Sequence, residues 1–214
     1  MYKLLILIVL TIFVAGCSLP EPIFDNFEGK FVYSVDSPLN SPNPEDSINY
    51  QIVYAKDSML RIDSYTPIGK QIYIKHIPRN RAYILMDLGP KKVAIQTIPD
   101  TSKASKYIFD YKMGSKKMAE RKAKNISVTD TSHDTTMVMN YLPEISPKYS
   151  NAIKGIPGLP AKYKLESNGM WITYELKSIE KQSMDIDYFG IPSDYEIISL
   201  DSFIDLIKKQ DQSN

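Results

Sequence analysis

Apolar and polar residues alternate along most of this chain, and this period of two constrains the fold more than any other feature. Phe31, Tyr33 and Val35, for example, alternate with Lys30 and Ser34. Such alternation is typical of half-buried antiparallel strands. The sequence therefore predicts a mainly β protein. The further segments with this rhythm contain Ile48, Tyr50, Ile52 and Tyr54; Leu60 and Ile62; Ile72 and Ile74; Tyr83 and Leu85; Val93 and Ile95; Tyr107, Phe109 and Tyr111; Met137, Val138 and Met139; Leu159, Ala161, Tyr163 and Leu165; and Met170, Ile172, Tyr174 and Leu176.

Two local signals complete the secondary-structure prediction. Asn168-Gly169 separates the last two strands and predicts a type I′ hairpin turn. Helical spacing appears near the end of the chain, at Leu200, Phe203, Ile204 and Ile207. We expect a short closing helix there, packed on the sheet.

Two proline-rich segments carry little strand signal. Residues 37–47 contain three prolines, and residues 143–160 contain four prolines with Gly155 and Gly158. Long loops of this kind in a compact domain are often functional. They are either docking elements or solvent-facing connectors.

The N-terminus has the parts of a secretory signal. A basic start at Lys3 is followed by an apolar run over residues 4–14, and then by Ala15-Gly16 before Cys17, the only cysteine. The alternative is a retained transmembrane helix. Residues 4–16 would span only about 20 Å as a helix, whereas the hydrocarbon core of a bilayer is ~30 Å thick.

Val14-Ala15-Gly16-Cys17 closely resembles the lipobox of bacterial lipoproteins. That resemblance implies that the Cys17 thiol receives a diacylglyceryl group, that the signal is cut before Cys17, and that the new α-amine is acylated, with palmitate among the attached acyl chains. We expect residues 1–16 to be the signal peptide, 17–27 a lipidated tether and 28–214 a single β domain. Ser18 is not the aspartate that resembles an inner-membrane retention signal, so we expect an outer-membrane anchor on the periplasmic face. Exposure on the cell surface is the open alternative.

Composition limits the partners of the mature chain. Removing residues 1–16 from 214 leaves 198 residues, and it takes one lysine from 26 basic residues and nothing from 25 acidic ones. The resulting neutral chain lacks the positive charge that nucleic-acid binding requires. A chain of this length forms one domain with a substantial core without disulfides.

The C-terminal third carries a second resemblance. Its successive motifs are Lys154-Gly155-Ile156-Pro157-Gly158-Leu159-Pro160, Tyr163-Lys164-Leu165-Glu166, Asn168-Gly169-Met170, Ile179-Glu180-Lys181 and Phe189-Gly190-Ile191-Pro192-Ser193-Asp194-Tyr195. This order resembles an uncharacterised Bacteroidetes lipoprotein family with the pattern PGLPLEY, NGM, IEKK and IP-DY. That family is similar to the family named for its Gly-Leu-Pro-Gly-Leu-Ile motif, and both are grouped with the LolA and LolB lipoprotein carriers.

The second resemblance covers roughly residues 135–200. It implies a strongly curved antiparallel sheet, a half-open barrel whose concave face is closed by helices and loops. The family often has an Ile-Ala-Gly-Tyr element where this chain has Met118-Ala119-Glu120-Arg121. It provides no catalytic residues to carry over.

Few residues indicate catalysis. His76 and His133 are the only histidines, and neither has a second histidine or cysteine at metal-ligand spacing. Asp185 and Asp187 are paired carboxylates, but a glycosidase pair also needs a cleft. We therefore expect no enzyme, no metal and no cofactor.

Two groups of residues suggest binding instead. Tyrosine and methionine at alternating strand positions suit a pocket for acyl chains, although they also fill ordinary β cores. The candidate lining residues are Phe31, Tyr33, Tyr50, Ile52, Tyr54, Met137, Met139, Tyr163, Met170, Ile172 and Tyr174. The candidate contacts to lipid headgroups are Lys116, Lys117, Arg121, Lys122 and Lys124, which otherwise form a solvated surface.

These observations support two hypotheses. The first is an outer-membrane lipoprotein that binds a lipid, an acyl chain or a lipoprotein's lipid in a curved-sheet cavity without catalysis. The second is an accessory or scaffold subunit of an outer-membrane protein complex.

Overall fold

The computed structural model describes residues 24–38, 50–66, 69–89, 91–97, 107–132, 135–167 and 169–211. Strands dominate these residues, and the prediction of a mainly β protein is confirmed. The elements are β1 (Glu28–Asp36), β2 (Tyr50–Lys56), β3 (Met59–Thr66), β4 (Gly69–His76), β5 (Arg81–Asp87), β6 (Lys92–Gln96), β7 (Tyr107–Met118), β8 (Arg121–Asp130), β9 (Thr135–Leu142), η3 (Pro147–Tyr149), β10 (Leu159–Ser167), β11 (Met170–Lys181), η4 (Ile186–Phe189), β12 (Glu196–Ser199) and α1 (Leu200–Asp211).

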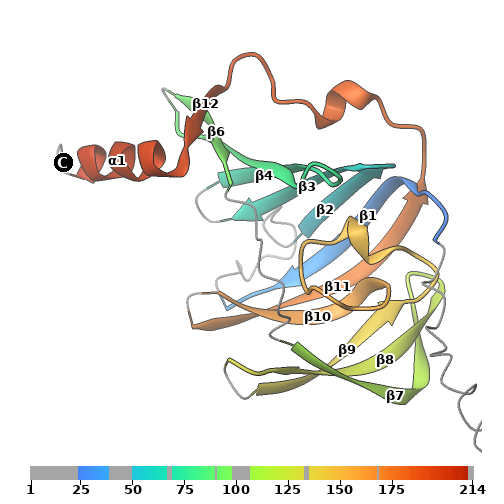
Figure 1. Cartoon of the computed structure of the whole chain (residues 1–214). Coiled ribbons are helices and arrows are strands. Elements are labelled where there is room, and N and C mark those ends of the chain that lie inside the picture. The colour runs from blue at the N-terminus through green and yellow to red at the C-terminus, as the bar shows by residue number, and fades with distance from the viewer. Residues whose placement is uncertain are drawn as a thin grey trace, which may run out of the picture.

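The strands form one 12-stranded sheet in the order β12-β6-β5-β4-β3-β2-β1-β11-β10-β9-β8-β7. Neighbours are antiparallel except β12 and β6, which pair in parallel. The sheet curves strongly, so that β2–β6 form one arm and β7–β9 the other, with β1 and β11 at the bend (Figure 1). The predicted curved antiparallel sheet is therefore confirmed.

A large apolar cluster fills much of the concave side of the sheet. Its members come from both arms and include Phe31, Leu60, Ile126 and Met139, which are almost fully buried. Burial of a large apolar side chain stabilises the fold by roughly 1.5–3 kcal/mol relative to exposure. The cluster therefore holds the two arms together.

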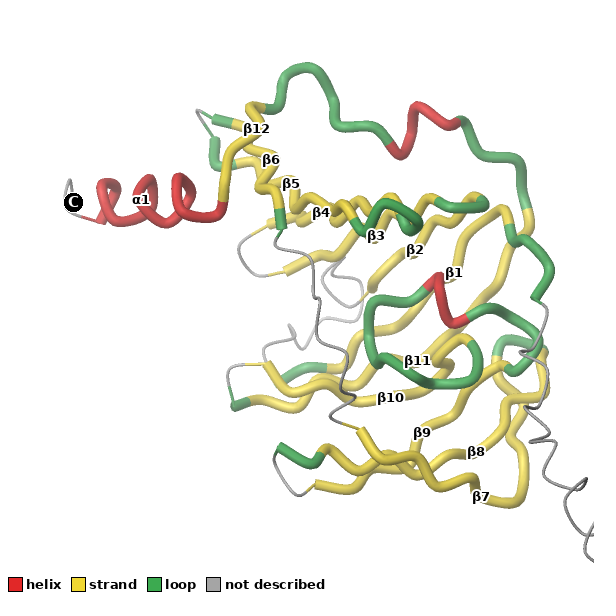
Figure 2. The backbone as a smooth tube through the Cα atoms, viewed as in Figure 1, coloured by secondary structure: helices red, strands yellow, loops and turns green. Residues whose placement is uncertain are grey.

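The loop between β9 and β10 lies on this concave side (Figure 2). As the proline-rich pattern predicts, residues 143–158 form no strand, and their only regular element is the short turn η3. Gly158 lets this loop pass close to β9, because a Cβ there would lie 2.2 Å from the carbonyl oxygen of Leu142. The loop is thus packed into the domain.

The predicted β10–β11 hairpin is confirmed. Ser167 pairs with Met170 across a two-residue turn, and Gly169 has a φ of +75°. That left-handed conformation is the one that a type I′ turn requires and that glycine adopts easily.

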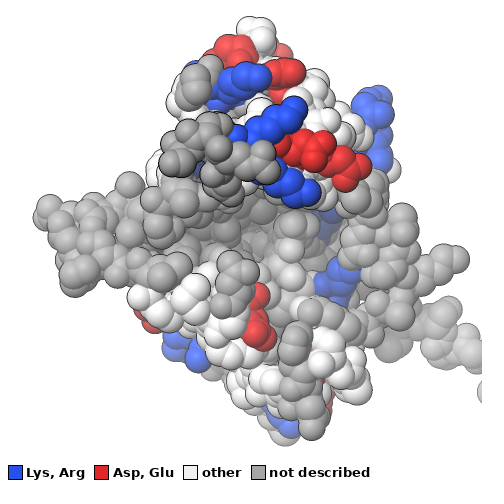
Figure 3. Space-filling model, turned by 90° about the vertical axis from the view of Figure 1, so that its left-hand side faces the viewer, with Lys and Arg blue, Asp and Glu red and all other residues white. Residues whose placement is uncertain are grey.

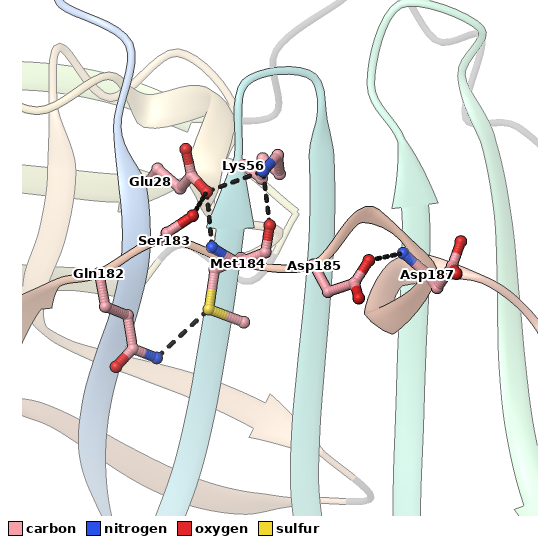
Figure 4. Close-up of polar contacts among 7 residues, drawn as sticks. All are labelled: Glu28, Lys56, Gln182, Ser183, Met184, Asp185 and Asp187. Atoms are coloured by element: carbon pink, nitrogen blue, oxygen red, sulfur yellow. Dashed lines mark hydrogen bonds and ion pairs between the residues drawn. The ribbon is translucent and has the colours of Figure 1, made fainter.

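A strap of residues 182–195 runs from the end of β11 across the outer face of the sheet to β12 (Figure 1). Figure 4 shows its first attachment, where a Glu28 carboxylate oxygen accepts from the Lys56 ammonium at 2.8 Å and from the Met184 backbone N–H at 2.6 Å. These bonds, from Lys56 first, hold the pKa of Glu28 below its ordinary value. The Asp185 carboxylate then accepts from the Asp187 backbone N–H and begins η4.

Buried charges attach the middle of the strap. Asp63 is nearly inaccessible and contacts Arg61 and Lys70, each at 2.8 Å. Arg61 also donates to the Tyr188 backbone oxygen at 2.9 Å, and its guanidinium lies 4.0 Å from the centre of the Tyr188 ring. Buried ions need such partners to offset desolvation. Further along, Ile191 and Tyr195 of the strap pack on a small outer-face cluster of Ile74, Leu85 and Ala94.

The helix α1 exists where the sequence predicts it, but its packing differs from the expectation. It extends away from the edge of the sheet instead of covering a face (Figure 1). Leu200 and Ile204 are 39% and 42% exposed as a result. The strap, and not this helix, packs on the outer face of the sheet.

Candidate ligand cavity

A cavity of about 240 Å³ lies on the concave side, between the arm formed by β2–β5 and the β9–β10 loop. Figure 3 looks onto this hollowed part of the molecule, and the charged side chains drawn there surround the recess. Its lining residues are Tyr33, Gln51, Val53, Ile62, Ser64, Gln71, Tyr73, Ile84, Tyr149, Ser150, Asn151, Ala152, Tyr163, Leu165 and Tyr174.

Strand register arranges the lining into two rows. Val53, Ile62, Tyr73 and Ile84 lie opposite one another across β2, β3, β4 and β5 and form an apolar row. On each strand the next residue that faces inward is two positions away from the apolar row. On β2, β3 and β4 these residues form a second row, which is polar. It consists of Gln51, Ser64 and Gln71 beside Tyr33. The cavity therefore has an apolar band and a neutral polar band.

Three tyrosines, on β1, β11 and β10, continue the wall beside these rows. The Tyr163 and Tyr174 rings stack with centroids 4.9 Å apart, and the Tyr33 ring meets Tyr163 edge-on at 6.1 Å. The Tyr33 hydroxyl donates to the Pro160 carbonyl oxygen at 2.8 Å, which fixes its orientation. Burial raises the pKa of Tyr33, Tyr163 and Tyr174 above the ordinary value. All three hydroxyls therefore stay protonated and neutral.

The β9–β10 loop closes one side of the cavity. Tyr149 is fully buried, and its hydroxyl accepts from the Phe27 backbone N–H at 3.0 Å. The Tyr73 hydroxyl donates to the Asn151 side-chain oxygen at 3.5 Å, which links the loop to β4. Ser146 caps η3 by accepting from the Lys148 backbone N–H at 3.3 Å. The loop is thus tied to the start of the domain and to the sheet.

None of the fifteen lining residues is charged, and none is histidine or cysteine. Ser64 has Gln51 as its hydrogen-bond partner at 3.0 Å, and an amide cannot serve as a general base for it. The lining can therefore surround an apolar group and offer neutral hydrogen bonds. Among these fifteen described residues there is no charged acid or base and no activated nucleophile.

The structure separates the predicted lining residues into four groups. Tyr33, Tyr163 and Tyr174 line the cavity. The apolar cluster on the same side of the sheet includes Phe31 and Met139, and Met137 packs against it. In β11, Met170 and Ile172 are half-buried, and Ile172 pairs with the lining residue Leu165. Tyr50, Ile52 and Tyr54 lie on the outer face.

The placement of Tyr50, Ile52 and Tyr54 is contrary to our prediction, and strand geometry explains it. Successive residues of a strand face opposite sides, and in β2 the inward positions belong to Val53 and Ala55, which are buried. The other face of β2 is apolar because the strap covers part of it, as the contact of the Tyr54 and Tyr188 rings at 5.0 Å shows.

Sequence reasoning missed the polar band and the loop residues of the cavity. Gln51, Ser64 and Gln71 face inward at positions where a core strand normally carries an apolar side chain. Each of these polar residues is two positions from Val53, Ile62 or Tyr73 on the same strand. This spacing of two could have identified them as inward-facing residues.

The predicted basic cluster lies on the β7–β8 hairpin. Lys116, Lys117, Arg121, Lys122 and Lys124 are all exposed. Lys117 pairs with Glu120 at 2.5 Å across the turn, where both ions are largely solvated. The cluster lies outside the residues that line the cavity.

Other candidates from the sequence take different positions. The His76 ring nitrogen accepts from the Arg79 backbone N–H at 3.3 Å in the β4–β5 turn. Asp185 and Asp187 belong to the strap and are exposed. Cys17, the signal segment 1–16 and His133 lie outside the described residues. Within the described ranges, no group of three or more His, Cys, Asp or Glu side chains could hold a metal ion, and no helix is long and apolar enough to cross a membrane.

Comparison with known proteins gives a likeness of fold. No protein-family model and no curated protein matches the chain. A solved structure of PNGF-II in space group P21 is similar, with a TM-score of 0.54 and 16% sequence identity. The alignment covers 84% of this chain and 33% of the PNGF-II chain, so this chain spans about a third of that protein's length. The likeness supports the β architecture alone.

Proposed function

We propose that this protein is a lipid-anchored outer-membrane protein that binds an apolar ligand in its curved sheet without catalysis. The cavity of about 240 Å³ beside the β9–β10 loop is the observation that carries the proposal. A concave and mainly apolar site with a few polar groups is the usual form of a small-molecule site. The Cys17 lipobox resemblance supports the anchor, and the periplasmic face is the proposed location.

The size of the cavity limits the ligand. Ligand pockets commonly measure about 300–1,000 Å³, so about 240 Å³ holds a small molecule or the end of a larger one. An acyl chain of a lipid or lipoprotein satisfies this limit by inserting its end and leaving the remainder outside.

The chemistry of the lining limits the ligand further. The apolar row of Val53, Ile62 and Ile84 suits hydrocarbon, whereas the row of Gln51, Ser64 and Gln71 suits neutral hydrogen-bonding groups. A free carboxylate would meet no cation among the described lining residues, and burial of an unpaired charge is costly. We therefore propose an acyl chain in ester or amide linkage as the ligand.

Native mass spectrometry tests this proposal. The chain from Ser18 onward, which contains every described residue, is purified from cells without detergent and examined for bound lipid. We expect co-purifying acylated species that organic extraction removes. Protein without bound lipid that also fails to take up an added acyl ester would overturn the proposal.

A matched pair of tryptophan variants locates the binding. Leu165 lines the cavity, whereas Val138 is 71% exposed on β9. Leu165→Trp should fill the space and lower lipid occupancy at least tenfold, while Val138→Trp should leave occupancy unchanged. Circular dichroism confirms that both variants fold. Equal occupancy in the two folded variants counts against the cavity as the site.

An exposed apolar edge favours a second candidate function, that of an accessory subunit. β7 is the last strand of the sheet, and Ile108, Tyr111 and Met113 on it are 61%, 62% and 98% exposed. An edge strand offers unpaired backbone groups to a partner chain. Crosslinking of the membrane-bound protein should then recover a stoichiometric outer-membrane partner, and Met113→Lys should weaken its capture. A monomer in gentle detergent would exclude this role.

A further inference from the structure

The β7–β8 hairpin concentrates positive charge in a nearly neutral chain. Residues 112–124 contain six basic residues and one acidic residue, whereas the whole chain has a formal net charge of +1. The six basic side chains are all exposed. A local excess of this size attracts an anionic surface even when the whole molecule is neutral.

Strand register places the tip of this hairpin at the end of the sheet where the described chain begins. Gly29 at the start of β1 pairs with Lys181 at the end of β11. Because the intervening strands are antiparallel, the start of β10, the end of β9 and the start of β8 share this end. Met118 pairs with Arg121 at the tip. Figure 1 shows the start of the described chain and the β7–β8 turn on the same side of the molecule.

The cavity lies toward the opposite end of the strands. Gln51 is near the start of β2, Ser64 near the end of β3 and Gln71 near the start of β4, and the apolar row with Val53 lies at the middle of these strands. The β2–β3 turn lies at the other end of these strands, because Lys56 before the turn pairs with Glu28 at the start of β1. At the Glu28 end, Ala55 and Leu60 are packed in the apolar cluster. The basic tip and the hollow part of the sheet thus face different directions.

We propose that the β7–β8 hairpin rests on the anionic headgroups of the bilayer that carries the protein, so that the cavity opens away from that bilayer. The inference rests on the proposed anchor at Cys17. Six residues lie between Cys17 and residue 24, so the seven steps along the chain reach at most about 25 Å. Such a short tether keeps the basic tip close to the membrane. A basic patch commonly supplies the second signal beside a lipid chain.

Vesicle binding by the chain from Ser18 onward tests the surface without any acyl anchor. The test variant is Lys116→Gln, Arg121→Gln and Lys122→Gln combined. The control variant carries Lys91→Gln, Lys164→Gln and Lys208→Gln, which remove the same charge from exposed positions elsewhere. Binding is measured by co-sedimentation with vesicles of phosphatidylcholine alone or with phosphatidylglycerol, at low and physiological salt.

We expect binding to the vesicles that contain phosphatidylglycerol, weakened by salt, and none to phosphatidylcholine alone. The test variant should lose at least tenfold in affinity and the control variant less than threefold. Equal losses in the two variants, or no binding by the unmodified chain at low salt, would overturn the proposal.

A fluorophore measures the orientation on the native lipoprotein. Lys122→Cys labels the hairpin and Gln71→Cys labels the cavity, and each is reconstituted into vesicles that contain a lipid-linked quencher. We expect quenching at residue 122 and little at residue 71. The reverse pattern would overturn the proposed orientation. Lipid occupancy of the cavity, measured separately on the chain from Ser18, shows whether the ligand proposal fails independently of this one.

Discussion

Glu175 on β11 is held by two lysines. Its carboxylate oxygens lie 2.6 Å from the Lys162 ammonium and 2.9 Å from the Lys177 ammonium. Hydrogen bonds from Lys162 and then Lys177 lower the pKa of Glu175 to about 2. A carboxylate with a lowered pKa stabilises the folded state above its unfolded pKa, and this contribution is lost as the pH falls through the folded value.

Glu175→Gln should therefore lower the free energy of unfolding at pH 7 by about 0.5–1 kcal/mol, the range for partly solvated ion pairs. The difference from the unmodified protein should shrink as the pH falls from about 4.5 to about 2. Urea unfolding at several pH values measures it. Glu166→Gln, which changes an exposed carboxylate on β10, should have little effect. A constant difference down to pH 2 would contradict the assignment.

Gly29 lies close to the backbone of β11 in the middle of the sheet. Its φ is +146°, and a Cβ at this position would lie 2.0 Å from the Glu180 carbonyl oxygen. Gly29→Ala should therefore destabilise the protein by about 3 kcal/mol or more, because β1 and β11 must separate. Gly69→Ala is the control, since its φ is +111° but nothing lies within 4 Å of the added carbon. Thermal unfolding should show a clearly smaller loss for Gly69→Ala.

At the scale of elements, the strap depends on the buried Arg61–Asp63 pair. Arg61→Leu should destabilise the protein by about 3–5 kcal/mol, because the Asp63 carboxylate would stay buried with one cation fewer. The strap should also become more accessible, since Arg61 binds the Tyr188 carbonyl. Urea unfolding measures the first effect and limited proteolysis of residues 182–195 the second.

The double variant Arg61→Leu with Asp63→Leu distinguishes a charge effect from loss of packing. It removes both ions together, so its free energy of unfolding should exceed that of Arg61→Leu alone. If the single and double variants are equally unstable, desolvation of Asp63 is not the cause.

Elements with one apolar face could be predicted from the sequence, and elements covered on both faces were harder to interpret. Alternation identifies β1 and the β10–β11 hairpin because their inward positions carry residues such as Phe31 and Tyr163. In β2 both faces are apolar, so period alone assigns Tyr54 to the wrong side. In β8 the lysines around Ala123 obscure the alternation of apolar and polar residues. The sequence pattern therefore does not predict this strand, although it buries Ile126 and Val128.

The candidate site was predictable only in part for a related reason. Tyr33, Tyr163 and Tyr174 follow the strand rhythm, whereas the loop residues 149–152 reach the cavity through tertiary packing. No local sequence pattern predicts that the β9–β10 loop packs against the concave side of the sheet. The outer-face strap likewise depends on contacts such as Arg61 with Tyr188, which are separated by 127 residues.

At the scale of the whole molecule, we predict that Cys17 carries the anchor. Cys17→Ser should abolish incorporation of labelled palmitate, because a hydroxyl is far less nucleophilic than a thiolate. Signal cleavage should then fail or occur elsewhere, so that the variant keeps residues 1–16 or has an aberrant N-terminus. Folding should be unchanged, since residue 17 precedes the first strand at Glu28. A variant that still takes up label and pellets with the outer membrane would contradict the lipoprotein prediction.

The pairing of β1 with β11 determines when this protein can finish folding. Phe31 lies opposite Ile179, so the centre of the sheet joins the beginning of the described chain to a segment made much later. Until β11 is available, β1–β6 and β7–β10 can form only two separate meanders, and the edges of β1 and β10 that β11 later joins remain unpaired. Distant contacts of this kind slow folding and prolong the exposure of sheet edges. During synthesis these edges therefore stay exposed until β11 has been made.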